Sequence, residues 1–206
     1  MTGIDPRRPA GPAILAVIVG LGVTGCSTKH PSPITEASGR VVQPLADLPY
    51  WRVEGRLGVK SSQGGINANL FWEHDGHQDR VRISGPFSQG AVSIILQPDL
   101  ILINEGNGRV ETARDPEEAL KNRLGFDVPV MSLRYWMLGI PAPDRAEPAT
   151  RTGAPGDAGF TQRGWSLKYE NFTRLEGQEV PQKISLQGQD ARLKLVIDNW
   201  AGNKTQ

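Results

Sequence analysis

The sequence predicts a mainly β fold of the α+β class, in which two helices lie over the concave face of a curved antiparallel sheet. Polar and apolar residues alternate strictly from Trp51 onward, which is typical of half-buried strands. Turn-forming dipeptides recur at regular intervals, and helix signals interrupt the strands near the middle of the chain. A sheet that curls without filling its interior leaves a cavity between the sheet and the helices.

The first predicted β-hairpin covers residues 51–60 and 66–72. In both segments apolar residues alternate with charged residues or asparagines. Residues 61–65, Ser-Ser-Gln-Gly-Gly, provide the small and flexible residues that a connecting turn needs. One face of this hairpin is therefore expected to lie in the core and the other in water.

Further short strands are separated by pairs of turn-forming residues. These pairs are Asp75-Gly76, Gly85-Pro86, Pro98-Asp99 and Asn107-Gly108. The predicted strands are residues 80–84, 91–97, 99–104 and 109–113 in the first half, and residues 165–170, 182–187 and 191–199 in the second half. The first half of the chain is therefore predicted to be an antiparallel meander.

Two helices are predicted between the two groups of strands. Asp115 is a helix N-cap, Pro116 suits the first helical position, and Gly125 ends the first helix. The second helix covers residues 131–138. Residues 141–159, rich in Pro, Ala and Gly, predict a loop before the strands resume.

The N-terminus has the three parts of an export signal. Arg7 and Arg8 supply the positive end, and the apolar run at residues 13–23 is too short to span a bilayer. Small residues then lead into Cys26, and this ending resembles the lipobox of bacterial lipoproteins. The resemblance implies cleavage before Cys26, with N-acyl and S-diacylglycerol groups on that residue. The alternative is an ordinary secretory signal that contains a cysteine.

The lipobox divides the chain into a signal peptide at residues 1–25, a lipidated tether at 26–44 and one domain at 45–206. About 16 flexible residues span roughly 20 to 25 Å, and two or more acyl chains give lasting attachment to a membrane. Ser27 stands where inner-membrane retention in many such bacteria uses Asp, so the resemblance implies sorting to the outer membrane.

Composition excludes several classes of function. The 23 basic and 22 acidic residues give a net charge of +1, which argues against nucleic-acid binding. Cys26 is the only cysteine, so the domain has no disulfide available. His74, His77 and Asp79 lie close together in sequence, but without a third placed ligand we interpret the histidines as solvated turn residues and expect no metal and no cofactor. We also expect a monomer.

A set of residues spread over nearly the whole domain resembles the LolB family of outer-membrane lipoproteins. The set is Trp51, Gly55-Arg56-Leu57, Gly65 to Trp72, Gly85-Pro86-Phe87, Leu124-Gly125, Pro129-Val130, Leu133, Trp136, Leu138-Gly139, Pro141, Gln162, Gly164-Trp165, Tyr169, Pro181 and Ile197 to Trp200. The resemblance implies an incomplete antiparallel β-barrel with a helical lid over an apolar cavity that holds acyl chains. This agrees with the fold that the alternation and the central helices predict.

The resemblance also implies a function that is not enzymatic. A LolB-type receptor accepts lipidated cargo proteins from the periplasmic carrier LolA and inserts them into outer-membrane lipid, with its own domain facing the periplasm. Transfer of an acyl chain of about 14 CH₂ groups into water costs roughly 11 kcal/mol of free energy. Direct passage between two apolar cavities avoids this barrier.

One loop is the expected membrane-delivery site. In this family the loop carries an exposed apolar residue, usually Leu, and here Pro86 and Phe87 occupy it. Phe87 keeps the apolar character, whereas Ser88 replaces the usual Gly. The alternative is that Phe87 folds back onto the sheet.

The candidates for the cavity wall and lid are large apolar residues of the predicted strands and helices. They are Leu57, Leu70, Trp72, Ile83, Ile94, Leu120, Leu133, Trp136 and Met137. The alternative for each of them is an ordinary position in the core, because spacing does not separate a wall from a core.

Two other functions remain open at the level of sequence. The first is a structural outer-membrane lipoprotein with a solid core that binds a protein or glycan partner. The second is a lipid hydrolase, but no Gly-x-Ser-x-Gly turn is present. A carrier with acidic residues around its opening would dock on Arg52, Arg56, Arg80 and Arg82, unless these form only a solvated face.

Overall fold

A computed structural model describes residues 44–85, 90–152 and 158–202. Residues Ile34–Gln206 form one compact unit. The expected signal peptide and nearly all of the expected tether lie outside the described ranges, and the first described element is a short 3-10 helix at Leu45–Asp47. No helix within these ranges is long and apolar enough to cross a membrane.

The fold is mainly β, as the sequence predicts, and its strands form one antiparallel sheet. The order in the sheet is β6-β5-β4-β3-β2-β1-β11-β10-β9-β8-β7. The strands are β1 (Trp51–Ser61), β2 (Gly64–His74), β3 (Asp79–Ser84), β4 (Val92–Gln97), β5 (Leu100–Asn104), β6 (Val110–Ala113), β7 (Thr150–Arg151), β8 (Gly159–Gln162), β9 (Trp165–Leu175), β10 (Gln178–Gln187) and β11 (Ala191–Ala201).

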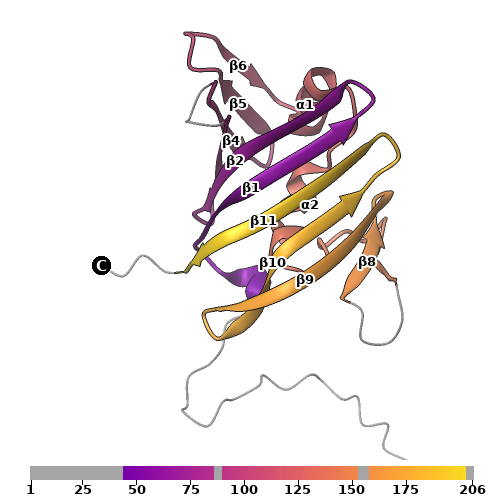
Figure 1. The fold of residues 1–206 in the computed structure, drawn as a ribbon. Helices are drawn as coiled ribbons and strands as arrows, with labels where there is room; N and C mark the ends of the chain where they lie inside the picture. The colour runs from indigo at the N-terminus through magenta and orange to yellow at the C-terminus, as the bar shows by residue number, and fades with distance from the viewer. Residues whose placement is uncertain (1–43, 86–89, 153–157, 203–206) are drawn as a thin grey trace, which may run out of the picture. The chain divides into compact units, whose positions relative to one another are not determined.

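The sheet consists of two meanders that join at the first and last strands. Strands β1 to β6 form one arm, β7 to β11 form the other, and β1 pairs with β11 in the middle. The helices α1 (Pro116–Leu124) and α2 (Val130–Met137) connect the arms and lie behind the central strands in Figure 1. They cover the inner face of an open sheet, which is the predicted half-barrel with a lid.

A β-bulge interrupts the pairing of β1 with β11 at Gly55. The register shifts between Glu54 and Gly55, so that Asp198 has no direct partner across the pair. A Cβ atom on Gly55 would lie 2.3 Å from the carbonyl oxygen of Val196, which is closer than real Cβ contacts. The close approach of the two backbones explains the glycine, and a bulge of this kind increases the local bend and twist of the sheet.

The core lies between the inner face of the sheet and the two helices. Alternate residues of β1, β2, β10 and β11 point into it, as the burial of these strands shows. Trp51 is 2% exposed, and its ring lies 5.9 Å from that of Trp72 and 5.8 Å from that of Trp200. These tryptophans fill the core at one end of the central strands.

The helix ends follow the signals in the sequence. The side chain of Asp115 accepts hydrogen bonds from the backbone N–H groups of Glu117 and Glu118, both at 3.0 Å. Gly125 has a φ of 76°, the left-handed conformation that commonly ends a helix. Helix α2 begins at Val130 and ends at Met137, one residue before the predicted bounds at each end.

The second arm is larger than the sequence predicts. Strands β7 and β8 lie partly within the region predicted as a loop, and β9 and β10 continue to a turn at Glu176-Gly177. Asn171 has a φ of 54°, which breaks the alternation of β9, and Pro181 lies inside β10. Both features are atypical of strands, which is why the alternation pattern underestimates the length of this hairpin.

Candidate functional site

The nine candidate wall and lid residues come together between the sheet and the helices. Six of them are buried in the central hydrophobic cluster and three are partly buried against it. The buried six are Leu57, Leu70, Trp72, Leu120, Trp136 and Met137, and the other three are Ile83, Ile94 and Leu133. They come from β1 to β4 and from both helices, and in this structure they pack on one another.

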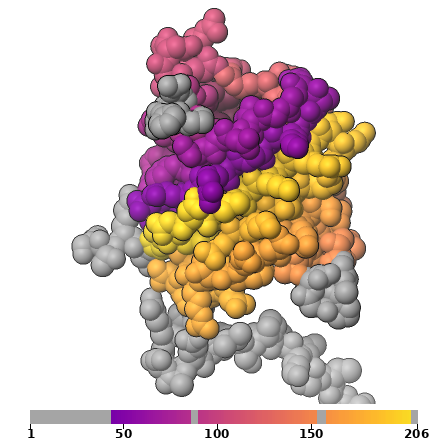
Figure 2. All heavy atoms as spheres, in the orientation of Figure 1, coloured from indigo at the N-terminus to yellow at the C-terminus, as the bar shows by residue number. Residues whose placement is uncertain are grey.

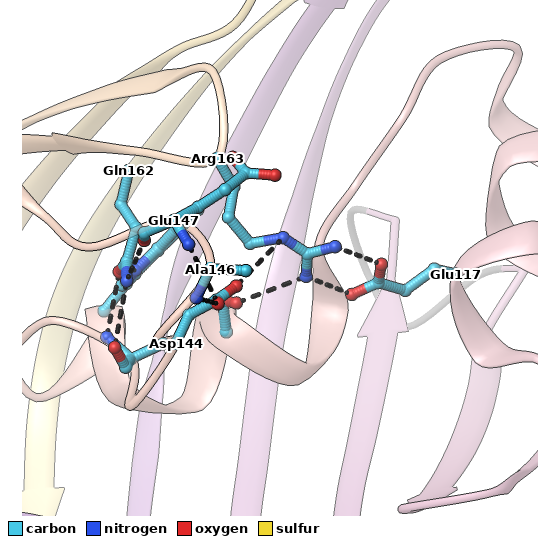
Figure 3. A network of polar contacts seen from close by, with 9 residues as sticks. Glu117, Asp144, Ala146, Glu147, Gln162 and Arg163 are labelled. Carbon is cyan, nitrogen blue, oxygen red and sulfur yellow. Dashed lines mark hydrogen bonds and ion pairs between the residues drawn. The ribbon is translucent and has the colours of Figure 1, made fainter.

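Helix α2 is held at its C-terminal end by Gln162 of β8. Gln162 is 2% exposed, and its Oε1 accepts hydrogen bonds from Nε1 of Trp136 and from the backbone N–H of Ala142, both at 2.9 Å. Its Nε2 donates to the carbonyl oxygens of Ala142 (2.9 Å) and Glu147 (3.1 Å). One amide side chain therefore fixes α2, the segment after it and the second arm together (Figure 3).

Helix α1 is ion-paired at its first turn to the second arm. Arg163, in the turn between β8 and β9, donates two hydrogen bonds to the carboxylate of Glu117, at 2.7 and 2.8 Å. Figure 3 shows its guanidinium group between Glu117 and Asp144, which lies at 4.0 Å. The hydrogen bond to Glu117 raises the pKa of Arg163, although partial burial opposes the shift.

Helix α1 is ion-paired at its last turn to the first arm. Arg123 pairs with Glu105, which follows β5, and lies 3.5 Å from Glu111 of β6. The helix therefore spans from one arm of the sheet to the other, with a charged contact at each end. Part-exposed ion pairs of this kind contribute about 0 to 1 kcal/mol each.

A buried carboxylate connects helix α2 to the first arm. Asp79 of β3 is 2% exposed, and its Oδ1 accepts a hydrogen bond from Nε1 of Trp72 at 2.9 Å. Oδ1 also lies 3.0 Å from Nδ1 of His74, and Oδ2 lies 3.7 Å from Nη1 of Arg134 on α2. Both helices are thus held by polar side chains around an apolar interior.

The sequence-based interpretation of His74 as a solvated turn residue is wrong. His74 is the last residue of β2, it is 8% exposed, and its ring stacks on that of Trp51 at 5.5 Å. The strand continues to the turn, so the alternation directs His74 into the core. His77 is exposed, as predicted.

The role of Gln162 and Asp79 in holding the helices was not predicted from sequence. The available signal was their position in the alternation, because Gln162 shares a face with the buried Phe160, and Asp79 shares a face with the buried Val81. A polar residue on an apolar face of a strand is expected to have a buried partner.

The lipidation site and the delivery loop fall outside the described residues. Cys26 precedes the first described range, and Pro86 and Phe87 lie between the first and second. The strands around the loop are described: β3 ends at Ser84 and β4 begins at Val92. The roles of Cys26, Pro86 and Phe87 therefore stay predictions.

Three of the four arginines expected to meet an acidic carrier are paired with carboxylates of the chain itself. The pairs are Arg52 with Glu54 at 3.8 Å, Arg56 with Asp198 at 2.7 Å, and Arg80 with Glu73 at 2.9 Å. The hydrogen bonds that Arg56 donates to the carboxylate of Asp198 raise the pKa of Arg56. Arg82 forms no ion pair with any residue in the described ranges. These pairs favour the solvated-face interpretation for most of the group.

Metal-binding geometry is not found in the described part of the chain. No group of three His, Cys, Asp or Glu side chains there could hold a metal ion. His74 and Asp79 meet, but their partners are the two tryptophans and Arg134.

Comparisons with known proteins match most of the chain to one family. A family model described as outer membrane lipoprotein LolB matches residues 49–200. The outer-membrane lipoprotein LolB of Pseudomonas fluorescens is 31% identical over 193 residues, which cover 93% of each chain. That of Pseudomonas syringae pv. syringae is 32% identical over 163 residues, which cover 79% of each chain. A solved LolA superfamily protein from Nitrosomonas europaea aligns with a TM-score of 0.48 and 9% identity, over 78% of this chain and 89% of its own.

The family match covers both arms of the sheet, the two helices and the residues that hold them. The relatives are outer-membrane lipoproteins, which agrees with the location expected from the lipobox and Ser27. From the extent of these matches, the chain belongs to the outer membrane lipoprotein LolB family.

Proposed function

We propose that this outer-membrane lipoprotein accepts lipidated proteins from a LolA-type periplasmic carrier, binds their acyl chains between the sheet and the two helices, and inserts them into the outer membrane. The observation that carries the proposal is the contrast between the apolar interior and the polar contacts that hold the two helices over it. The surfaces of α1 and α2 that face the sheet are apolar, while the contacts that hold the helices to the two arms are polar.

The free energy of burying an acyl chain is large compared with that of the ion pairs that hold helix α1. Transfer of an acyl chain of about 14 CH₂ groups from water into an apolar site is favourable by roughly 11 kcal/mol. The part-exposed ion pairs at the two ends of α1 contribute about 0 to 1 kcal/mol each, so their release is a small part of that amount. A helix held in this way can move aside when an acyl chain replaces it against the sheet.

The direction of cargo transfer depends on the difference in acyl-chain affinity between the carrier and this protein. Each 1.4 kcal/mol of difference between the carrier and this protein changes the equilibrium tenfold. No covalent bond forms or breaks in such a transfer, so the proposal needs no catalytic residue and no cofactor. Trp72, Trp136 and Met137 supply broad and adaptable apolar surfaces that suit acyl chains of variable shape.

Photo-crosslinking at two adjacent residues of β2 tests where the acyl chains bind. Leu70 is 6% exposed on the inner face, whereas Phe71 lies on the outer face. A photoreactive residue at Leu70 should crosslink to the acyl chains of cargo presented by the loaded carrier, and one at Phe71 should give at most a tenth of that yield. Equal yields at both positions, or no yield at Leu70 with cargo bound elsewhere, would favour a solid core that binds its partners from outside.

The Phe87→Glu variant should accept cargo and fail to deliver it. A carboxylate in place of an apolar side chain opposes entry into the bilayer, so we expect delivery to membranes to fall at least tenfold while crosslinking at Leu70 stays unchanged. Sedimentation of cargo with vesicles measures delivery. Phe87→Leu, which keeps an apolar side chain, serves as the control and should deliver as the parent does. Normal delivery by the Phe87→Glu variant would contradict the proposed role of the loop.

A further inference from the structure

The outer face of the sheet carries a depression of about 690 Å³ over strands β2, β1 and β11. Figure 2 shows this face, with β1 in indigo and β11 in yellow. At its centre lies Gly58, which is opposite Asn67 on one side and Lys194 on the other. Gly65, which is opposite Lys60, also lines it. The two glycines therefore leave a gap between the long polar side chains of their neighbours on the outer face.

Four cationic side chains line the depression: Arg56, Lys60, Arg192 and Lys194. Lys60 and Arg192 are direct partners across β1 and β11, and like charges in that arrangement destabilise a sheet. Arg56 pairs with Asp198, but the other three form no ion pair with any residue of the described chain. The positive charge of the depression is therefore available to an anionic ligand.

The depression also offers amide and apolar groups. The side-chain oxygen of Asn67 lies 3.2 Å from the place where a Cβ of Gly58 would be, so the Asn67 amide reaches over the centre. Val196, which is 36% exposed and lies opposite Arg56, places an aliphatic side chain on the outer face beside these cations. Ile66 also lines the depression, but it lies opposite Val59 and therefore shares the inner face of β2 with Leu70. Clustered cations beside an exposed aliphatic side chain are typical of surfaces that bind anionic lipid headgroups.

We propose that this depression binds the phosphate headgroups of anionic phospholipids and orients the domain on the membrane surface. The cations are complementary to anionic headgroups, and the exposed aliphatic side chain of Val196 beside them favours a lipid surface over an acidic protein. Position favours it as well, because Asn69 lines the depression and its Nδ2 lies 3.5 Å from the carbonyl oxygen of Gly85, the residue before the segment with Phe87. Asn69 of β2 therefore lies between the depression and the residue at which the expected delivery loop begins.

Vesicle binding of the compact unit Ile34–Gln206, which contains every described strand and helix, tests the proposal without carrier or cargo. The unit should sediment with phosphatidylcholine vesicles that contain phosphatidylglycerol, and not with phosphatidylcholine alone. Replacing both Lys60 and Lys194 by Gln should weaken binding about thirtyfold, because each cation near an anionic surface contributes about 1 kcal/mol.

Two further variants separate charge from shape. Arg145→Gln combined with Arg174→Gln removes the same charge from exposed positions outside the depression, and its binding should stay within about threefold of the parent. Gly58→Val fills the depression without changing the charge, and it should also weaken binding; its thermal unfolding shows whether it is folded.

Three results would overturn the proposal. The unit could bind both kinds of vesicle equally, or the two double variants could lose binding equally. In the third, the Lys60 and Lys194 variant binds anionic vesicles normally but no longer takes cargo from the carrier, which would assign the depression to an acidic protein partner. Because the vesicle assay contains no cargo, failure here leaves the proposed transfer function standing.

Discussion

Replacing Gln162 by Leu should lower the free energy of unfolding by about 3 to 5 kcal/mol. The side chain is 2% exposed and satisfies three buried groups, namely Nε1 of Trp136 and the backbone N–H and carbonyl of Ala142, together with the part-buried carbonyl of Glu147. Leucine fills a similar volume but leaves these groups without a partner. Each unsatisfied buried group costs about 1 to 3 kcal/mol, and partial access of water reduces the sum.

Urea denaturation followed by tryptophan fluorescence measures this effect. Gln187→Leu is the matched control, because Gln187 lies on the exposed face of β10 and, within the described part of the chain, its side chain donates a single hydrogen bond, to the carbonyl of Gly188. That variant should stay within about 0.5 kcal/mol of the parent. A loss below about 1 kcal/mol for Gln162→Leu would mean that the network does not hold α2 in solution.

The Gly55→Ala variant should lose about 3 kcal/mol or more, although it adds only one methyl group. Its Cβ would lie 2.3 Å from the carbonyl oxygen and 3.1 Å from the carbonyl carbon of Val196. Both are backbone atoms of the neighbouring strand, so relief requires β1 and β11 to separate at the bulge. The cost therefore falls on the pair of strands that joins the two arms.

Gly58→Ala on the same strand is the control for this prediction. Its Cβ would meet the side-chain oxygen of Asn67 at 3.2 Å, and that side chain can rotate away. We expect a change within about 0.5 kcal/mol, because strand glycines also carry an entropic penalty that alanine relieves. Thermal unfolding of both variants under the same conditions compares them directly. Similar stabilities of the two variants would refute the role of Gly55 at the bulge.

The elements that the sequence predicts well are those whose signals are local. Alternation in residues 51–60 and 66–72 defines β1 and β2, and Asp115 with Gly125 defines α1. The second arm is predicted less completely, because Asn171 and Pro181 break the strand pattern within β9 and β10. The pairing of β1 with β11 leaves no local signal, since it joins residues at opposite ends of the domain.

The candidate site divides in the same way. The apolar residues around the helices could be selected from sequence because large side chains recur at strand and helix spacing. The residues that fasten the helices could not, because Arg163 and Glu117 are far apart in the chain and each is an ordinary surface type. Periodicity also does not distinguish an apolar surface that opens from one that stays packed, since both bury the same face of a strand.

The pairing of the first strand with the last also sets the order in which the domain can fold. Strand β1 lacks its neighbour on one side until β11 has left the export machinery, so the middle of the sheet forms after its flanks. Contacts this distant along the chain make folding slow. Until they form, the edge of β1 stays open to other chains, a hazard for an exported protein. Early release of a chain that lacks residues 191–201 would leave two separate half-sheets, because the missing strand is the one that joins them.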